Sequence, residues 1–598
     1  MEQSHDIYLV ATALEETWPK NKPFVFLGGW CLRFSRRQIW DSLHYTIAPY
    51  HWDERSLIDQ DFQYLQVVYE KILTHLVNKM NELHRVNFSK RYWRILLGPW
   101  LLIFTQTFFD RWQIILNAAK VYPDAKLFTL SEHVDNEASA DTKEFVEMVR
   151  TDEWNDRIFS LIAERWTTIN VMPVEQSNFS EKDSISSVGI KLSAYKRIGQ
   201  FFKVRIKMLI NKVASFSIFR GRAIFLHSSY LKRSQLIKFA LLFRQIFPIL
   251  NVIPGKKYLV EHDMRKWDLA WPDDDKFASA LSSLIPSFLP TCYVEGYREN
   301  SLAALDYAIP RMPSVMLTAN AFAWDEDWKF SAAFNCENGT KLVISQHGGH
   351  YGVASRASFY LHEAAISDRY LTWGWVDPKQ NKTYPAPAVK LIGSKRRKGE
   401  KKSGKCVLIL VSQSRYFFRI DTGYFGANFE KYINEKFIFV KSLSEFVKND
   451  LLVRNYHVDF GWDIETRWKE IEPTIRLSST HDNYLETITS ARLVVATYNS
   501  TTFLETLKSN IPTVIFWDPK VWELASEAES FYSELVKASI LFYDPVECAN
   551  HINAIWHDVP SWWKSKKVKN AVDSFTENYA YTGMAPLSEL KKALTEWV

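Results

Sequence analysis

The strongest fold signal in this chain is the segment Leu493-Val-Val-Ala-Thr-Tyr-Asn-Ser-Thr-Thr-Phe-Leu-Glu-Thr-Leu-Lys-Ser-Asn-Ile-Pro-Thr-Val-Ile-Phe-Trp517. Its first four residues are apolar, as in a strand that is buried on both faces. A polar turn over 497–502 leads into a segment with the apolar spacing of a helix. That helix should end before Pro512, because the residue preceding a proline is pushed out of the helical region. Residues 513–517 are again strand-like, so the segment predicts one part of a parallel α/β sheet.

The turn between the first strand and the helix predicts an anion site. A helix that starts at the carboxyl end of a buried parallel strand points its free N–H groups into the crevice beyond the sheet. Further donors and acceptors are Asn499, Ser500, Thr501 and Thr502. Glu505 lies one turn into the helix, where a carboxylate can hold a ribose hydroxyl pair. The prediction is a nucleotide-sugar site; the alternative is an N-cap followed by a first-turn acid that the helix dipole favours.

Length and composition describe a globular protein of two or three domains. The chain has 598 residues, more than one core usually serves. Hydrophobic residues make up 47% and charged residues 24%, which excludes a disordered chain. The net charge of +6 is weak and no nucleic-acid recognition motif accompanies it, so no nucleic-acid partner is expected. A weakly basic surface would suit an anionic substrate or the inner face of a membrane.

Cysteine usage and the apolar segments predict a cytoplasmic protein. The five cysteines are scattered and odd in number, which argues against a disulfide framework or a zinc site. Residues 1–6 lack the basic start and apolar core of a signal peptide. The longest apolar stretch, 95–104, is half as long as a spanning helix needs, so a buried segment is expected. The localisation predicted is cytoplasmic, at most peripheral at the inner face of the cytoplasmic membrane.

Short apolar strands alternate with helical patterns along the whole chain, which is typical of doubly wound parallel sheets. Strands are predicted at 7–11, 24–27, 93–97, 223–226, 314–317, 341–344, 369–373, 406–411 and 475–477. Helices are predicted at 59–83, 101–119, 484–489, 521–537, 546–555, 565–578 and 587–597.

The clearest boundary is the basic segment 394–405, which has no apolar residue and predicts a solvated linker. Its lysines border two domains and are also candidates for contact with phosphate. The first domain would span 1–393, with a helical insertion around 120–215, and the second 406–598, with terminal helices. The predicted fold is α/β, with two Rossmann-like domains that face each other across a cleft.

A second motif, Gln346-His347-Gly348-Gly349-His350, follows an apolar strand. The two glycines allow an unusual turn and the close approach of a ligand. Histidines three residues apart at the carboxyl edge of a sheet can supply a general base or a donor to a leaving phosphate. The alternative is a pair of hydrogen-bonded structural histidines in a tight turn.

Other candidates for the first domain stand near predicted strand ends. Glu295 is a candidate catalytic carboxylate, or else a solvated loop acid. Arg298 could bind a carboxylate or phosphate through two hydrogen bonds. Asn320 is expected at a crevice edge, and Gly28 and Gly29 would either touch an acceptor or only turn the chain.

In the second domain, polar residues follow the first predicted strand and should face the 497–502 turn across the crevice. They are Ser412, Gln413, Ser414 and Arg415. Asp325-Glu-Asp327 spells Asp-x-Asp but does not directly follow an apolar strand, so a metal-bridged nucleotide is not expected. We therefore expect neither a metal nor a cofactor, with a nucleotide sugar as co-substrate.

At these motifs the chain resembles bacterial surface-polysaccharide transferases, in particular a transferase family of O-antigen clusters. The matching residues are Gln346-His347-Gly348, Asn499-Ser500-Thr501 with Glu505, the early Leu27-Gly-Gly-Trp30 and His347-Gly-x-x-Tyr-Gly352. The resemblance extends over most of the chain. More distantly, the second half is similar to CDP-glycerol glycerophosphotransferases and to capsule transferases that use Kdo or nonulosonic acids.

The resemblance implies a GT-B-like glycosyltransferase with a nucleotide-activated donor and a glycan or lipid-linked oligosaccharide acceptor. It does not fix the donor, for which a CMP-linked sugar of Kdo or nonulosonic type is one candidate. It places the catalytic base on His347. We expect the donor on the second domain and the acceptor near Glu295, Asn320 and His347, with His347 or Glu295 as the base of an inverting reaction. The alternatives are a polyol-phosphate transferase or nucleotide-sugar epimerase on the same fold, and a non-catalytic nucleotide-binding module of an export or assembly complex.

Overall fold

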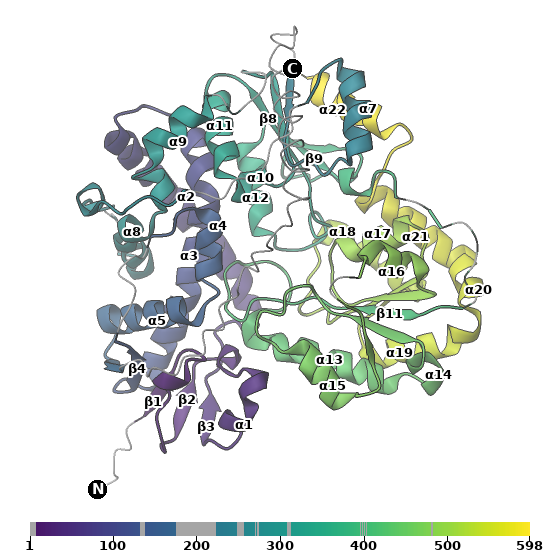
Figure 1. Ribbon diagram of the computed structural model, residues 1–598, viewed down its shortest axis with the longest axis horizontal. Coiled ribbons are helices and arrows are strands. Elements are labelled where there is room, and N and C mark those ends of the chain that lie inside the picture. Colours follow the sequence, from purple (N-terminus) through teal and green to yellow (C-terminus); the bar gives the residue numbers. More distant parts are fainter. Residues whose placement is uncertain are drawn as a thin grey trace, which may run out of the picture.

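Three parallel β-sheets organise the molecule (Figure 1). The computed structural model describes residues 7–131, 138–174, 223–247, 256–269, 271, 274–305, 307, 312–394, 396–397, 399, 401, 403–479 and 482–597. In Figure 1 the first sheet lies at the lower left, the second at the top and the third at the right. The predicted α/β class is confirmed, but the part before the basic linker holds two sheets where one was expected.

The first sheet has the strand order β3-β2-β1-β4-β5. Its strands are β1 (Tyr8–Val10), β2 (Phe24–Phe26), β3 (Tyr45–Ile47), β4 (Lys126–Leu130) and β5 (Asn170–Val174). The sequence predicted a helical insertion around 120–215; two helices, α4 (Thr142–Met148) and α5 (Asp152–Trp166), lie in its described part, but they stand between β4 and β5, which belong to the first sheet. Residues 175–222 of the predicted insertion lie outside the described residues.

Two long helices, α2 (Ser56–His84) and α3 (Lys90–Val121), pack against each other beside this sheet. The strand predicted at 93–97 is wrong, because α3 continues unbroken through Gly98 and Pro99. Most of α3 is buried on all sides, so its sequence lacks the polar face that marks a helix in solvent. Among the helices of the described residues, none combines the length and apolar character that a bilayer crossing requires.

The second sheet consists of strands that each pair with their neighbour in the chain, in the order β10-β9-β8-β7-β6. They are β6 (Ile224–Leu226), β7 (Val315–Thr318), β8 (Lys341–Ser345), β9 (Arg369–Thr372) and β10 (Thr383–Pro385). The strands predicted at 223–226, 314–317, 341–344 and 369–373 are confirmed.

The third sheet has the Rossmann strand order β13-β12-β11-β14-β15-β16. Its strands are β11 (Cys406–Ile409), β12 (Leu451–Arg454), β13 (Arg476–Leu477), β14 (Leu493–Ala496), β15 (Thr513–Phe516) and β16 (Leu541–Phe542). The order reverses between β11 and β14, and ligands of doubly wound sheets bind beyond the strand ends at such a point. Helix α17 (Thr501–Lys508) starts there, as the sequence predicts.

The remaining helices cover these sheets or join them. They are α1 (Arg37–Trp40), α4 (Thr142–Met148), α5 (Asp152–Trp166), α7 (Arg233–Phe243), α8 (Lys276–Phe288), α9 (Tyr297–Ala304), α10 (Ala321–Trp324), α11 (Glu326–Glu337), α12 (Ser358–Ile366), α13 (Phe429–Ser442), α14 (Glu445–Lys448), α15 (Ile464–Ile471), α16 (Tyr484–Ser490), α18 (Ser526–Lys537), α19 (Pro545–Ile555), α20 (Val559–Lys564), α21 (Lys566–Tyr579) and α22 (Pro586–Thr595). Leu590 and Leu594 of α22 pack with Phe239 of α7, so the last helix belongs to the unit of the second sheet.

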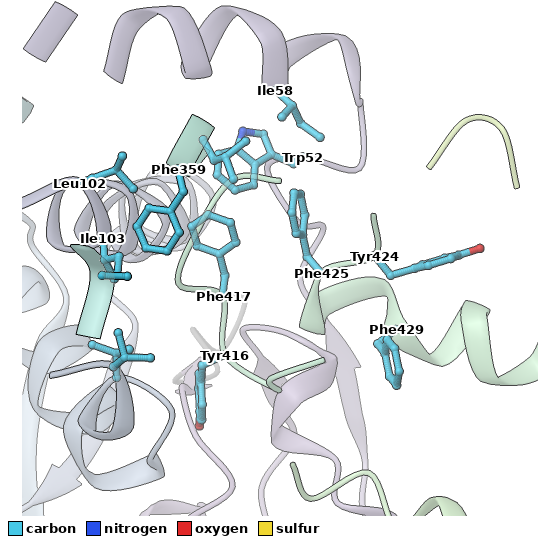
Figure 2. Close-up of a cluster of buried hydrophobic side chains, with 14 of the residues drawn as sticks. Trp52, Ile58, Leu102, Ile103, Phe359, Tyr416, Phe417, Tyr424, Phe425 and Phe429 are labelled. Atoms are coloured by element: carbon cyan, nitrogen blue, oxygen red, sulfur yellow. The ribbon is translucent and has the colours of Figure 1, made fainter. Parts of the chain in front are cut away.

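The loop after β11 contains Phe417 and Phe425, whose rings pack against Trp52; we call it the aromatic loop (Figure 2). This packing joins the third sheet to the first part of the chain. Figure 2 shows Phe417 and Phe425 beside Trp52, with ring centroids 4.9 and 5.4 Å from the Trp52 ring. Trp52 is fully buried. Such ring pairs contribute about 0.5–1.5 kcal/mol each beyond their buried area. Part of the high aromatic content of the chain therefore serves to join its units.

A buried ion pair strengthens the same joint. The Arg415 guanidinium pairs with Asp152 at the start of α5 and donates to the Trp30 carbonyl at 2.6 Å. The side chain of Arg415 is only 8% exposed. Burial alone would raise the pKa of Asp152, but the Arg415 charge together with hydrogen bonds from Arg415, Tyr416 and the Ala13 N–H outweighs it and holds that pKa below its usual range.

We predict that Asp152→Ala lowers the free energy of unfolding by about 3–5 kcal/mol, because it leaves the Arg415 charge buried without its partner. Thermal and urea unfolding measure the effect. Glu465→Ala is the matched control: it breaks the Glu465–Lys469 pair, whose side chains are 63% and 66% exposed, and should cost less than about 1 kcal/mol. Equal losses in the two variants would contradict a structural role for the buried pair.

Candidate functional site

The two motifs singled out in the sequence meet at the junction of the second and third sheets. The backbone N–H of Gly349, in the turn after β8, donates to the Thr501 hydroxyl at the start of α17, at 3.0 Å. A Cβ on Gly349 would lie 2.8 Å from the Ser500 carbonyl carbon and 2.8 Å from the Thr501 nitrogen. Only glycine permits this approach of two backbones.

The rest of the loop after β8 pairs with the part of the chain that carries the third sheet, which we call the third unit. Ala354 pairs with Leu524, and Ala357 with Asp421, in isolated antiparallel bridges. These bridges and the Gly349–Thr501 hydrogen bond hold the turn 346–350, which we call the histidine turn, against the turn that precedes α17.

His347 lies within a small polar cluster at this junction. Its side chain is 21% exposed, and its Nε2 is 3.3 Å from the Tyr351 hydroxyl. That hydroxyl donates to Glu363 of α12 at 2.7 Å, and the second Glu363 oxygen lies 3.9 Å from Nδ1 of His347. Sequence reasoning missed Tyr351 and Glu363. Glu363 is the one carboxylate in the mostly apolar helix α12, and this position could have identified it.

The electrostatic environment keeps His347 neutral. Burial, then the positive charge on His350, Arg419 and Lys390, lowers the pKa of His347 from 6.5 to about 3. Burial raises the pKa of Glu363 well above its usual range, which favours its neutral form. The cations near the turn have carboxylate neighbours, since Arg419 pairs with Asp421 at 2.5 Å and Lys390 lies 3.9 Å from Glu505.

Glu505 on α17 faces a residue of the other unit. Its carboxylate lies 3.9 Å from Nζ of Lys390 and is 18% exposed. Burial raises the pKa of Glu505, and Lys390 opposes that shift. The positive charge of Lys390 lowers the pKa of both Glu505 and His347. Lys390 is therefore close to both the predicted donor site and the predicted base.

Asn320 joins the edge of the same junction, as the sequence predicts for a residue after β7. Its amide accepts from Ser228 at 2.6 Å and donates to the Tyr230 hydroxyl at 3.0 Å. The ring of Tyr230 is 40% exposed and lies 5.9 Å from Nζ of Lys390. Ser228 and Tyr230 both have positive φ, 52° and 60°, which is uncommon for residues other than glycine.

Two polar side-chain atoms in the segments after β11 and β14 are buried without a hydrogen-bond partner among the described residues. They are Nδ2 of Asn499 and Oγ of Ser414. Oδ1 of Asn499, by contrast, accepts from the Tyr532 hydroxyl at 2.7 Å. A buried polar group without a partner is costly, and a ligand atom would satisfy it.

Other predicted donor-site residues are partly engaged within the protein. The Ser412 hydroxyl donates to the Asp459 carbonyl at 2.9 Å, and the Gln413 carbonyl accepts from the Trp462 indole at 2.7 Å. Thr502 shares a hydrogen bond with Tyr498. Ser500 is half-buried, and its side chain makes no capping bond.

Arg415 does not fill the role expected of it, because it is paired with Asp152 and is a structural cation instead of a free phosphate ligand. Arg298 is exposed on α9, and its predicted contact with an anion stays a prediction.

The expectation that Glu295 reaches the cleft is corrected. Its carboxylate is 2% exposed and pairs with the Arg265 guanidinium at 2.7 and 2.8 Å. It also accepts from the Glu261 backbone N–H at 3.1 Å. A carboxylate held in this way is not available to deprotonate an acceptor, which leaves His347 as the candidate base.

Three further residues expected in the cleft shape the protein instead. Gln346 is buried, accepting from the Trp373 backbone and the Trp375 indole, both at 2.8 Å. Gly28 leaves no room for a side chain beside the Trp30 ring. Gly29 packs near Ala427 of the third unit, and a Cβ there would lie 3.4 Å from the Ala427 carbonyl oxygen.

The turn glycine Gly348 and His350 both stay at the junction. The Gly348 carbonyl accepts from the Gln346 amide at 2.8 Å, which braces the turn. Burial lowers the pKa of His350 to about 4, with Asp421 opposing and Arg419 adding to the shift. Within the described residues, no three His, Cys, Asp or Glu side chains lie close enough together to hold a metal ion.

We predict that Gly349→Ala destabilises the junction, because the new methyl group would press on backbone atoms that cannot move aside; overpacking of this kind costs about 1–3 kcal/mol. Limited proteolysis and thermal unfolding measure it. Gly29→Ala is the control, since its Cβ would keep ordinary contact distance at another joint of the third unit. If Gly29→Ala destabilised the protein as much as Gly349→Ala, the close contact would not explain the effect.

The lowered histidine pKa values predict acid sensitivity. Unfolded histidines take up protons below pH 6.5, whereas folded His347 and His350 do so only near 3 and 4. Stability that is present above pH 6.5 should therefore be lost as the pH falls from 6.5 toward 4. In His350→Asn the fall in melting temperature between pH 7 and pH 5 should be smaller than in the wild type. An unchanged fall would contradict the burial of His350.

Several solved structures align with this chain at low sequence identity. The Anabaena protein HepE, in complex with UDP and glucose, is 11% identical over 62% of this chain and 98% of its own, with a TM-score of 0.34. MurG of Acinetobacter baumannii is 9% identical over 65% of this chain and 95% of its own, with a TM-score of 0.30. Among curated proteins, none matches the chain in sequence.

A family model covers nearly the whole chain. It is described as the LIC12162 family transferase and matches residues 7–594, from β1 to α22. The chain therefore belongs to the LIC12162 transferase family.

Proposed function

We propose that this transferase is a glycosyltransferase that moves a sugar from a nucleotide-activated donor to a glycan or lipid-linked acceptor. The observation that carries the proposal is the contact of the histidine turn with the start of α17, at the strand-order reversal of the third sheet. His347 stands two residues before Gly349, so the contact supports a neutral imidazole acting close to a helix N-terminus, a kind of site that suits phosphate.

The donor would bind at the third sheet. Its phosphate would lie near Ser500, where α17 begins and the Nδ2 of Asn499 lacks a protein partner within the described chain. Arg419 and Lys390 supply positive charge at the same junction, as their effect on the pKa of His347 indicates. We assign the ribose or base to the region of Glu505. These cationic side chains would stabilise the leaving phosphate, the role a metal fills in other transferases.

The acceptor would bind at the second sheet, near Asn320 and Tyr230, and His347 would serve as base. In an inverting reaction the acceptor oxygen bonds to the anomeric carbon, the bond from that carbon to the phosphate oxygen breaks, and the acceptor proton passes to His347. In a retaining reaction His347 would orient the acceptor. The charge of a bound phosphate favours the imidazolium form, so donor binding would raise the pKa of His347 toward the working pH.

The finer assignment is bacterial surface polysaccharide, O-antigen or capsule, with a CMP-linked Kdo or nonulosonic acid as donor. It rests on the resemblance of Gln346-His347-Gly348 and Asn499-Ser500-Thr501 to such enzymes. We further propose that the reaction needs no metal, and that the protein works at the inner face of the cytoplasmic membrane, where a lipid-linked acceptor is found.

We predict that His347→Ala and Glu505→Ala act on different steps. The first should lower kcat by about 10²–10⁴-fold, because general-base catalysis is lost, with little change in nucleotide affinity. The second should weaken nucleotide binding. Calorimetry with the nucleotide and steady-state kinetics separate the two. Glu465→Ala, on an exposed helix of the third unit, is the control and should change neither quantity. Equal and mild effects of both variants would reject the assigned roles.

The donor class is tested by thermal unfolding with CMP, CDP, UDP and GDP. A nucleotide at 100 times its Kd should add about 2.7 kcal/mol of stability. Nucleotide release that requires an acceptor supports transfer of a sugar, whereas release without one points to an epimerase, and transfer of a polyol phosphate would appear in the product. Stabilisation by none of the four would reject the donor site and favour a non-catalytic module.

A further inference from the structure

A cavity with a volume of about 580 Å³ lies at the C-terminal end of α17. Its lining comes from the carboxyl end of α17, from α20 and α21, and from described residues before and within the basic linker, among them Ile392, Arg396 and Lys401. Helix α17 has eight residues, so about 12 Å separates this cavity from the turn at Ser500. Its volume falls within the usual range for small-molecule sites.

Positive charge dominates the wall of this cavity, which we call the basic cavity. Among the described residues of its lining, the cationic ones are Arg396, Arg397, Lys401, Lys508, Lys564 and Lys569, and the acidic one is Asp573. The cationic residues come from two basic parts of the sequence, described residues of the linker and the segment 564–569, together with the end of α17. The proposed transfer reaction uses neither of them.

Cationic side chains of the basic cavity lie close enough to one another for their charges to interact. Burial, followed by the charge of Arg396, lowers the pKa of Lys508. Arg397 is anchored, since its guanidinium donates to the Thr489 and Ala491 carbonyls at 2.8 and 2.7 Å. Lys401 also donates to the Ser490 carbonyl at 3.2 Å, so Arg397 and Lys401 line the cavity while their charges are partly offset by carbonyls at the end of α16.

One side of the basic cavity is apolar. Leu507, Val568 and Trp563 contribute to it. The Trp563 indole donates to Asn510 at 3.0 Å, which fixes the ring as a wall. An apolar wall beside a cationic rim fits a ligand that has both an anionic group and an apolar part.

We propose that the basic cavity binds a phosphate group carried by a partly apolar molecule, separately from the nucleotide. Arginine and lysine are the side chains that proteins use for phosphate. The phosphate could come from a phosphorylated lipid or from a soluble phosphate compound, and the experiment distinguishes the two sources.

Calorimetric titration of the full-length protein with dihexanoyl phosphatidic acid and with inorganic pyrophosphate tests the proposal. The variant is Lys508→Gln combined with Lys569→Gln, and we expect it to weaken binding at least about ten-fold. The control is Lys469→Gln combined with Lys537→Gln, which removes the same charge from exposed helices of the third unit, where both side chains are 66% exposed. It should stay within about two-fold of the wild type.

Tighter binding of the lipid phosphate than of pyrophosphate, lost in the cavity variant alone, supports a lipid source. Comparable binding of both probes, again lost only there, supports a soluble one. Failure of both probes to bind, equal loss in the control, or no loss in the cavity variant overturns the proposal. A melting temperature equal to that of the wild type confirms that the variant folds, and retained stabilisation by the nucleotide separates this site from the donor site.

Discussion

The arrangement of the candidate site depends on one backbone contact, the hydrogen bond from the Gly349 N–H to the Thr501 hydroxyl. It joins a turn of the second sheet to the helix that starts at the strand-order reversal of the third. No side chain fits between the two backbones, so their separation is set by the main chain and not by a rotamer. The distance between His347 and α17 is fixed by the same contact.

That contact is held in place by a larger joint. The aromatic loop after β11 packs on Trp52, and the Arg415–Asp152 pair lies beneath it. Burial of aromatic rings supplies attraction without direction, whereas the ion pair and the bridge from Ala354 to Leu524 specify register. Arg415, which the sequence suggested as a ligand of the nucleotide donor, therefore helps to position the third unit instead.

The local elements were predictable from the sequence, and the pairings between them were not. The apolar run before Thr497 and the proline after α17 mark a strand and a helix end through local backbone chemistry. Lys390 and Glu505 stand more than a hundred positions apart, and no local pattern announces that they meet. The prediction that Glu295 lies in the cleft was wrong for the same reason, because no local sequence pattern shows that Glu295 pairs with Arg265. Helix α3 was divided in the prediction because a fully buried helix has no polar face to reveal its period.

The electrostatics of α17 unite the two sites. Its N-terminus carries about half a positive charge, and side chains such as Lys390 reinforce it. Its C-terminus carries about half a negative charge, which Lys508 alone would more than balance. Carbonyls at the end of α16 partly offset Arg397 and Lys401. Asp573 and Glu577 act on Lys508, but its pKa stays below the usual range because burial and the charge of Arg396 outweigh them. Solvent screens repulsion less well in a half-enclosed cavity than on an open surface, so the proposed phosphate would be stabilised most beside Lys508.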